Sequence, residues 1–137
     1  MAAQVSVVVT TVSGDDTLRF SGTGQLTRDD RGTHLDYTAA GEDSSLLRSQ
    51  LHLGLGRAVV HSSDYRLLLD PGRTTQAQLT TDGGTLPLTV ETHRVHADLV
   101  GDAGTITLHY TLLAQGRPLQ TLRVTLALTP NDKERTQ

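Results

Sequence analysis

The sequence predicts an all-β fold, a single closed or nearly closed antiparallel β-barrel of about 8–10 strands. Apolar and polar residues alternate in segment after segment, as at Leu18, Phe20 and Leu26, where polar residues or glycines stand between. A period of two is typical of a strand with one buried face. Gly- and Asp-rich sequences separate these segments, and such short connections favour pairing of neighbouring strands in chain order. So many strands in one small domain favour closure, which removes exposed sheet edges.

The first half of the chain predicts five strands, over residues 4–12, 17–27, 33–40, 50–55 and 57–62. Turn-forming residues separate the first three, beginning with Ser13-Gly14-Asp15-Asp16. Residues 41–50 form the least strand-like internal segment. Asp43-Ser44-Ser45 could cap a single helical turn there, but the segment is too short for its conformation to be assigned.

The second half predicts five more strands, over residues 65–69, 74–81, 85–100, 105–113 and 119–128. Asp70-Pro71-Gly72 and Asp82-Gly83-Gly84 indicate hairpins, because Pro presets φ and Gly accepts a positive φ. The segment 85–100 exceeds a typical strand length, so we expect a bend or bulge around 92–94. Residues 1–130 then form one domain, and 131–137 a polar, disordered tail.

Composition excludes several classes of function. The net charge of −3 and the 3% aromatic content give neither the positive surface nor the stacking platforms that nucleic acid needs. The absence of cysteine excludes disulfides and thiolate chemistry. Residues 1–5 lack the start of a signal peptide, and no stretch approaches the roughly 20 apolar residues of a membrane helix. We therefore expect a cytoplasmic protein with no nucleic-acid or membrane partner.

Six histidines raise the question of a metal site. His93 and His96 stand three apart, which on a straight strand places them on opposite faces, so only a bend would let both bind one ion. Glu91 shares a face with His93, and the pair His34 and Asp36 does the same. Neither pair has the third and fourth ligands of a metal site at diagnostic spacing. We predict solvated strand faces, no metal and no cofactor.

Two other patterns resemble catalytic motifs only in part. His61, Ser63 and Asp64 are the residue types of a hydrolase triad, but they share one turn and no Gly-x-Ser-x-Gly elbow is present. Gly22-Thr23-Gly24 and Gly54-Leu55-Gly56 lack the third glycine of a dinucleotide loop, and strand follows each where a helix should. Turn and bulge roles account for all of these residues. We therefore predict that the protein is not an enzyme.

The interior of the barrel is the remaining place for a ligand. Barrels of about eight strands are filled by side chains, whereas larger ones leave room for a ligand. The candidate ligand-binding residues are three arginines within strands and the three tyrosines: Arg19, Arg66, Arg123, Tyr37, Tyr65 and Tyr110. A lumenal arginine would bind an anionic group, although the parity of Arg19 and Arg123 favours the outer surface.

Several segments resemble one known family. They are FSG at 20–22, HLDY at 34–37, GRAVV at 56–60 and ITLHYTL at 106–112, together with Gly116. In these segments the chain is similar to the YwiB-like proteins, which are small bacterial β-barrels of calycin (lipocalin-like) type whose function is undefined. The lipocalin Gly-x-Trp signature is missing, because the sequence has no Trp. The resemblance implies the barrel and supplies no catalytic residue.

Three hypotheses of function follow. The first is a non-enzymatic barrel that binds a small apolar or amphipathic ligand in its lumen, which a completely filled interior would remove. The second is a homodimeric protein-interaction module without a small-molecule ligand, since Val8, Val12, Val59 and Leu68 break the apolar parity and would face outward. The third and weakest is a hydrolase or metal-binding protein whose site is scattered along the sequence.

Overall fold

A computed structural model describes residues 2–62 and 65–131, which form ten strands and no helix. The strands are β1 (Ala2–Ser13), β2 (Asp16–Asp29), β3 (Gly32–Gly41), β4 (Leu46–Gly54), β5 (Arg57–Ser62), β6 (Tyr65–Leu69), β7 (Thr74–Thr81), β8 (Gly84–Val100), β9 (Ala103–Ala114) and β10 (Arg117–Pro130). In this part of the chain no helix is long and apolar enough to cross a membrane.

Antiparallel pairing of the first and last strands closes the sheet into a barrel. Each strand pairs with its neighbour in chain order, and β1 then pairs with β10 from Val5 opposite Pro130 to Val12 opposite Arg123. The predicted all-β barrel and its meander order are therefore confirmed. Closure gives every strand two partners, so alternate residues all around the ring face one shared interior.

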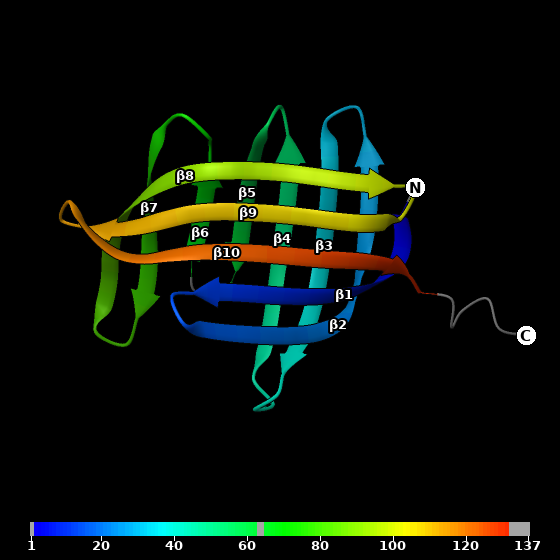
Figure 1. The fold of residues 1–137 in the computed structure, drawn as a ribbon, viewed down its shortest axis with the longest axis horizontal. Coiled ribbons are helices and arrows are strands. Elements are labelled where there is room, and N and C mark those ends of the chain that lie inside the picture. The colour runs from blue at the N-terminus through cyan, green and yellow to red at the C-terminus, as the bar shows by residue number, and fades with distance from the viewer. Residues whose placement is uncertain (1, 63–64, 132–137) are drawn as a thin grey trace, which may run out of the picture.

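The barrel is flattened into two crossing layers (Figure 1). The front layer contains β8, β9, β10, β1 and the first part of β2, and β3 to β7 run across them in the rear layer. Strands that pass between crossed sheets turn the corner through bends or bulges. Glycines allow this in β2, because a Cβ at Gly22 or Gly24 would collide with the backbone of β3 at Thr38 or Asp36.

A β-bulge interrupts the long strand β8. Its register with β9 shifts between Thr92 and Arg94, so His93 is the extra residue. The irregularity predicted around 92–94 is confirmed. Its consequence is a change of parity, because Thr92 faces Tyr110 inside the barrel whereas Arg94 faces His109 outside it.

The core is a single cluster of aliphatic side chains that fills one part of the interior. Val5, Val7, Leu26, Leu35 and Leu128 are each no more than 1% exposed. They come from β1, β2, β3 and β10, so the two layers are held together by the burial of these side chains. Burying one such residue contributes roughly 1.5–3 kcal/mol relative to leaving it exposed.

No helical turn follows Gly41, which settles the alternative that the sequence left open. Residues 42–45 form a turn in which the Gly41 amide donates to the Ser45 carbonyl at 2.8 Å, and Ser44 has a φ of 69°. The carboxylate of Asp43 accepts hydrogen bonds from the amide and the hydroxyl of Ser45, which lower its pKa. Asp43 therefore caps a tight turn, and β4 begins at Leu46, earlier than predicted.

The end of the chain is described only as far as Asn131. Its amide donates to the carbonyl of Gln4 at 3.0 Å, which extends the pairing of β10 with β1. The rest of the predicted tail lies outside the described residues.

Substitution of Gly22 tests the bend by which β2 passes between the two layers. Gly22→Ala should lower the free energy of unfolding by about 1–3 kcal/mol, because the added methyl group must displace the β3 backbone at Thr38. Gly83→Ala is the matched control, since its Cβ would meet only the Thr81 hydroxyl at 3.9 Å, and its effect should stay within about 0.5 kcal/mol. Equal effects of the two substitutions in urea unfolding would contradict the close approach of β2 and β3.

Candidate functional site

A cavity of about 230 Å³ lies inside the barrel, between the two layers. Strands of both layers line it, with hydrocarbon side chains over most of its wall. Its polar lining is limited to hydroxyl groups, those of Thr11, Tyr37, Ser49, Tyr65 and Tyr110. No residue that carries a formal charge lines it in the described part of the chain.

The cavity has a closed floor and a more exposed rim. The floor contains Val9 and Leu126, each 1% exposed, which continue into the packed core. Half-buried Phe20, Leu47 and Leu122 form the rim. Phe20 is the only phenylalanine of the chain and no tryptophan is present. The ring of ten strands therefore encloses more space at this end than the side chains present there fill.

The three tyrosines predicted as ligand-binding candidates come together here. Tyr37 on β3, Tyr65 on β6 and Tyr110 on β9 all line the cavity. Burial raises the pKa of Tyr37 to about 12, although a side-chain hydrogen bond with Ser49 opposes the shift. Burial also raises the pKa of Tyr110, with Tyr65 and Tyr37 adding to the effect. The hydroxyl groups of Tyr37 and Tyr110 are therefore protonated and uncharged at neutral pH.

Thr92 places a further hydroxyl inside the barrel. It lies opposite Tyr110 on the neighbouring strand and is 6% exposed. Its Oγ1 is buried and has no hydrogen-bond partner among the described residues. Since buried polar atoms are nearly always paired, Thr92 indicates unused hydrogen-bonding capacity next to Tyr110.

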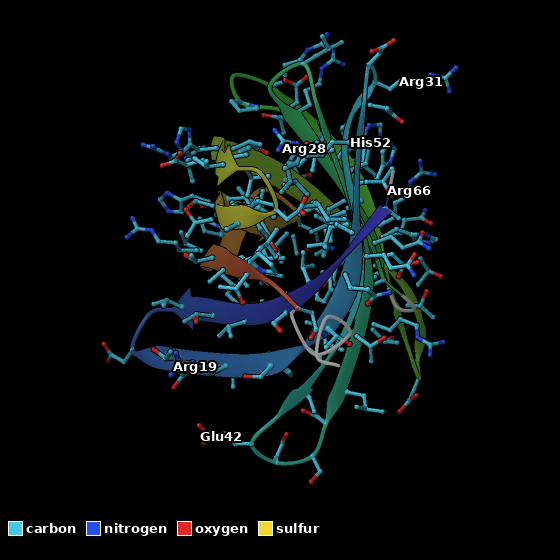
Figure 2. All side chains as sticks on the ribbon, turned by 90° about the vertical axis from the view of Figure 1, so that its right-hand side faces the viewer. Arg19, Arg28, Arg31, Glu42, His52 and Arg66 are labelled. Carbon is cyan, nitrogen blue, oxygen red and sulfur yellow. The ribbon has the colours of Figure 1, made fainter. Side chains whose placement is uncertain are left out.

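The three candidate arginines lie outside the barrel. Arg19, Arg66 and Arg123 are exposed, and Figure 2 shows Arg19 and Arg66 on the outer sides of their strands. The parity that favoured the surface for Arg19 and Arg123 matches this placement. None of the three faces the cavity, so an anionic group inside it would find no arginine there.

A pair of stacked histidines on the outer surface was not predicted. His34 on β3 and His52 on β4 occupy paired register positions, and their ring centroids are 4.0 Å apart. His34 Nε2 lies 4.0 Å from the Asp29 carboxylate, and His52 Nε2 lies 3.2 Å from the Arg31 carbonyl oxygen. The pairing depends on the register between β3 and β4, which composition and spacing do not give.

The bulge in β8 creates a second histidine cluster. His93 Nε2 lies 2.8 Å from Thr111 Oγ1, which is 2.9 Å from Thr121 Oγ1, and the His93 ring lies 4.8 Å from that of His109. Desolvation lowers the pKa of His109, and nearby His93 and Arg123 lower it further. This network links the outer faces of β8, β9 and β10.

The bend that His93 and His96 need in order to share a face is present, because the bulge resets the parity. His93 contacts Thr111, and His96 lies opposite Thr107, both on the outer face of β9. Among the described residues no three His, Cys, Asp or Glu side chains gather where they could hold a metal ion. Ser63 and Asp64 of the partial triad lie outside the described residues.

The outward apolar residues divide into two pairs. Val59 and Leu68 are cross-strand neighbours on β5 and β6 in the rear layer, whereas Val8 and Val12 lie on β1 in the front layer. The two most exposed, Val12 and Leu68, are only 38% and 37% accessible. These residues do not join into one apolar face.

The fold and the cavity define a class: small closed meander β-barrels with a mainly apolar interior cavity. The chain matches the family described as "Domain of unknown function (DUF1934)" over residues 4–126, and it belongs to that family. Its fold is similar to that in the crystal structure of the YwiB protein from Bacillus subtilis, with a TM-score of 0.79 and 18% identity over 95% of this chain and 93% of that one. The resemblance to YwiB-like barrels is thereby confirmed. A comparison with curated proteins gives no match.

High pH should destabilise the fold through the buried tyrosines. Because the pKa of Tyr37 is raised from 10.0 to about 12, the unfolded chain loses this proton first, and stability falls as pH rises from 10 to 12. The shift corresponds to a loss of about 2–3 kcal/mol at pH 12, and Tyr110 acts in the same direction. Urea unfolding between pH 8 and pH 12 measures this loss.

The double variant Tyr37→Phe/Tyr110→Phe is the control for this measurement. In this variant the stability should fall much less between pH 8 and pH 12, since neither position then titrates. An undiminished decline in the double variant would assign the pH dependence to other groups.

Proposed function

We propose that the protein is a non-enzymatic binding protein that holds a small, mainly apolar ligand in the cavity between the layers. The observation that carries this proposal is the cavity itself, which an interior filled by side chains would lack. Apolar walls with a few convergent polar groups are typical of small-molecule sites. The lining supplies hydrocarbon and hydroxyl groups, which suit binding, and no paired carboxylates or histidines for acid–base chemistry.

The volume limits the size of the ligand. About 230 Å³ exceeds the roughly 150 Å³ of an engineered protein cavity that binds benzene. It is smaller than the roughly 300 Å³ at which pockets for drug-sized ligands begin. The proposed ligands are therefore compounds of one or two rings, or short branched chains of similar bulk.

Filling the cavity should abolish binding. Indole is a suitable probe, and saturable shifts of the methyl resonances of Leu47, Val60 and Leu122 should follow its addition in NMR titration. Val124→Phe places a larger side chain in the lining, which should weaken indole binding at least tenfold, about 1.4 kcal/mol. Val12→Phe on the outer face of β1 is the matched control and should bind indole as the unmodified protein does.

Two results would contradict the proposal. One is the absence of any saturable shift at the cavity methyl groups with indole. The other is equal weakening by Val124→Phe and Val12→Phe, because this would place the indole outside the barrel.

A further inference from the structure

Two pairs of hydroxyl side chains lie on opposite layers of the barrel interior. Tyr37 and Ser49 are register partners on β3 and β4 in the rear layer, and a side-chain hydrogen bond joins them. Tyr110 and Thr92 are register partners on β9 and β8 in the front layer. Tyr37 and Tyr110 both line the cavity and are close enough to interact electrostatically. Tyr37, Ser49 and Tyr110 therefore bring hydroxyl groups to a cavity that is otherwise lined mainly by hydrocarbon side chains.

The two pairs differ in how far their hydrogen bonds are satisfied. In the rear pair, Ser49 donates its one hydroxyl proton to the His61 carbonyl at 3.4 Å, so in the bond between Ser49 and Tyr37 the tyrosine hydroxyl is the donor. In the front pair, the Thr92 hydroxyl is buried with no partner among the described residues. Thr92 does not line the cavity, so the hydroxyl of the front pair that a ligand in the cavity would meet is that of Tyr110.

The interior and the outer surface of the barrel differ in charge. Arg66 and Arg123 are exposed on the outside, and no cationic residue of the described chain lines the cavity. Transfer of an unpaired carboxylate or phosphate into such a space is strongly unfavourable. A neutral oxygen is different, because a tyrosine hydroxyl can donate to it and no counterion is required.

We propose that the cavity selects uncharged ligands that carry a hydrogen-bond-accepting oxygen, such as aryl ketones, and excludes carboxylates of the same shape. The apolar body lies against the Leu and Val side chains, and the oxygen lies beside the Tyr110 hydroxyl, which donates to it. This inference rests on the proposed function and specifies the chemical class of its ligand.

Three compounds of similar shape test the selection: acetophenone, benzoate and isopropylbenzene. The first has a neutral acceptor, the second a charged one and the third none. In NMR titrations at pH 7, acetophenone should bind at least roughly 100-fold more tightly than benzoate. Isopropylbenzene is the reference for apolar burial, since it makes no hydrogen bond.

The tyrosine hydroxyls are tested by Tyr37→Phe, Tyr110→Phe and their combination. Tyr110→Phe removes the proposed donor and should lower the affinity for acetophenone relative to isopropylbenzene by roughly threefold to tenfold. Tyr37→Phe should change this ratio less, because the Tyr37 hydroxyl donates to Ser49. Leu119→Ala, an exposed position on β10, is the control and should leave the ratio unchanged. The comparison of acetophenone with benzoate needs no variant, so it stands even if a Tyr→Phe protein folds poorly.

The outcomes separate the two proposals. Benzoate binding as tightly as acetophenone would overturn the selection of uncharged ligands. An affinity ratio that is unchanged in the double variant would overturn the role of the tyrosine hydroxyls. In either case the proposed function stands, whereas no saturable shift at the cavity methyl groups with any of the three compounds would contradict the proposed function itself.

Discussion

Pairing of β1 with β10 is the constraint on which the rest of the structure depends. It runs from Val5 opposite Pro130 to Val12 opposite Arg123 and turns a ribbon of hairpins into a ring. Once the ring is closed, its interior has a size set by the number and tilt of the strands, whatever side chains it holds. Aliphatic residues such as Leu26 and Leu35 fill one part of that space. The cavity near Tyr37 and Tyr110 is the part that they do not fill.

The polar groups inside the barrel follow from the same geometry. An inward position on a strand is inward whatever residue occupies it, so Ser49, Thr92 and Thr11 face the interior alongside leucines and valines. Their hydroxyl groups are tolerated there because a hydroxyl is far less costly to bury than a charge. Arg66 and Arg123 lie on the outward parity, and no charged residue of the described chain lines the cavity. The interior is consequently uncharged but retains hydrogen-bonding groups, and this property carries both proposals.

Strand positions could be predicted from sequence because period-two alternation and turn residues are local signals. Even the irregularity in β8 followed from its length. The turn at residues 42–45 could not be assigned because Asp43 caps a helix and a tight turn with the same hydrogen bonds to nearby amides. The relative faces of His93 and His96 could not be predicted for a different reason, since they depend on the exact position of the bulge, where one extra residue reverses the parity of everything beyond it.

The candidate site could be predicted only in part. The three tyrosines were identified as ligand-binding candidates, but their convergence depends on which strands face each other across the barrel. The stacking of His34 on His52 and the unpaired hydroxyl of Thr92 depend on cross-strand register. Register is set by closure and by distant turns, so a single sequence carries little direct signal of it.

Diffraction from crystals pressurised with xenon is the most direct test of the hollow end of the barrel, because xenon enters dry apolar cavities. The account predicts a xenon site inside the barrel, among Val60, Leu108 and Tyr110, with the protein otherwise unchanged. Side chains of Phe20 and Leu122 folded into this space, with no xenon between the layers, would contradict it.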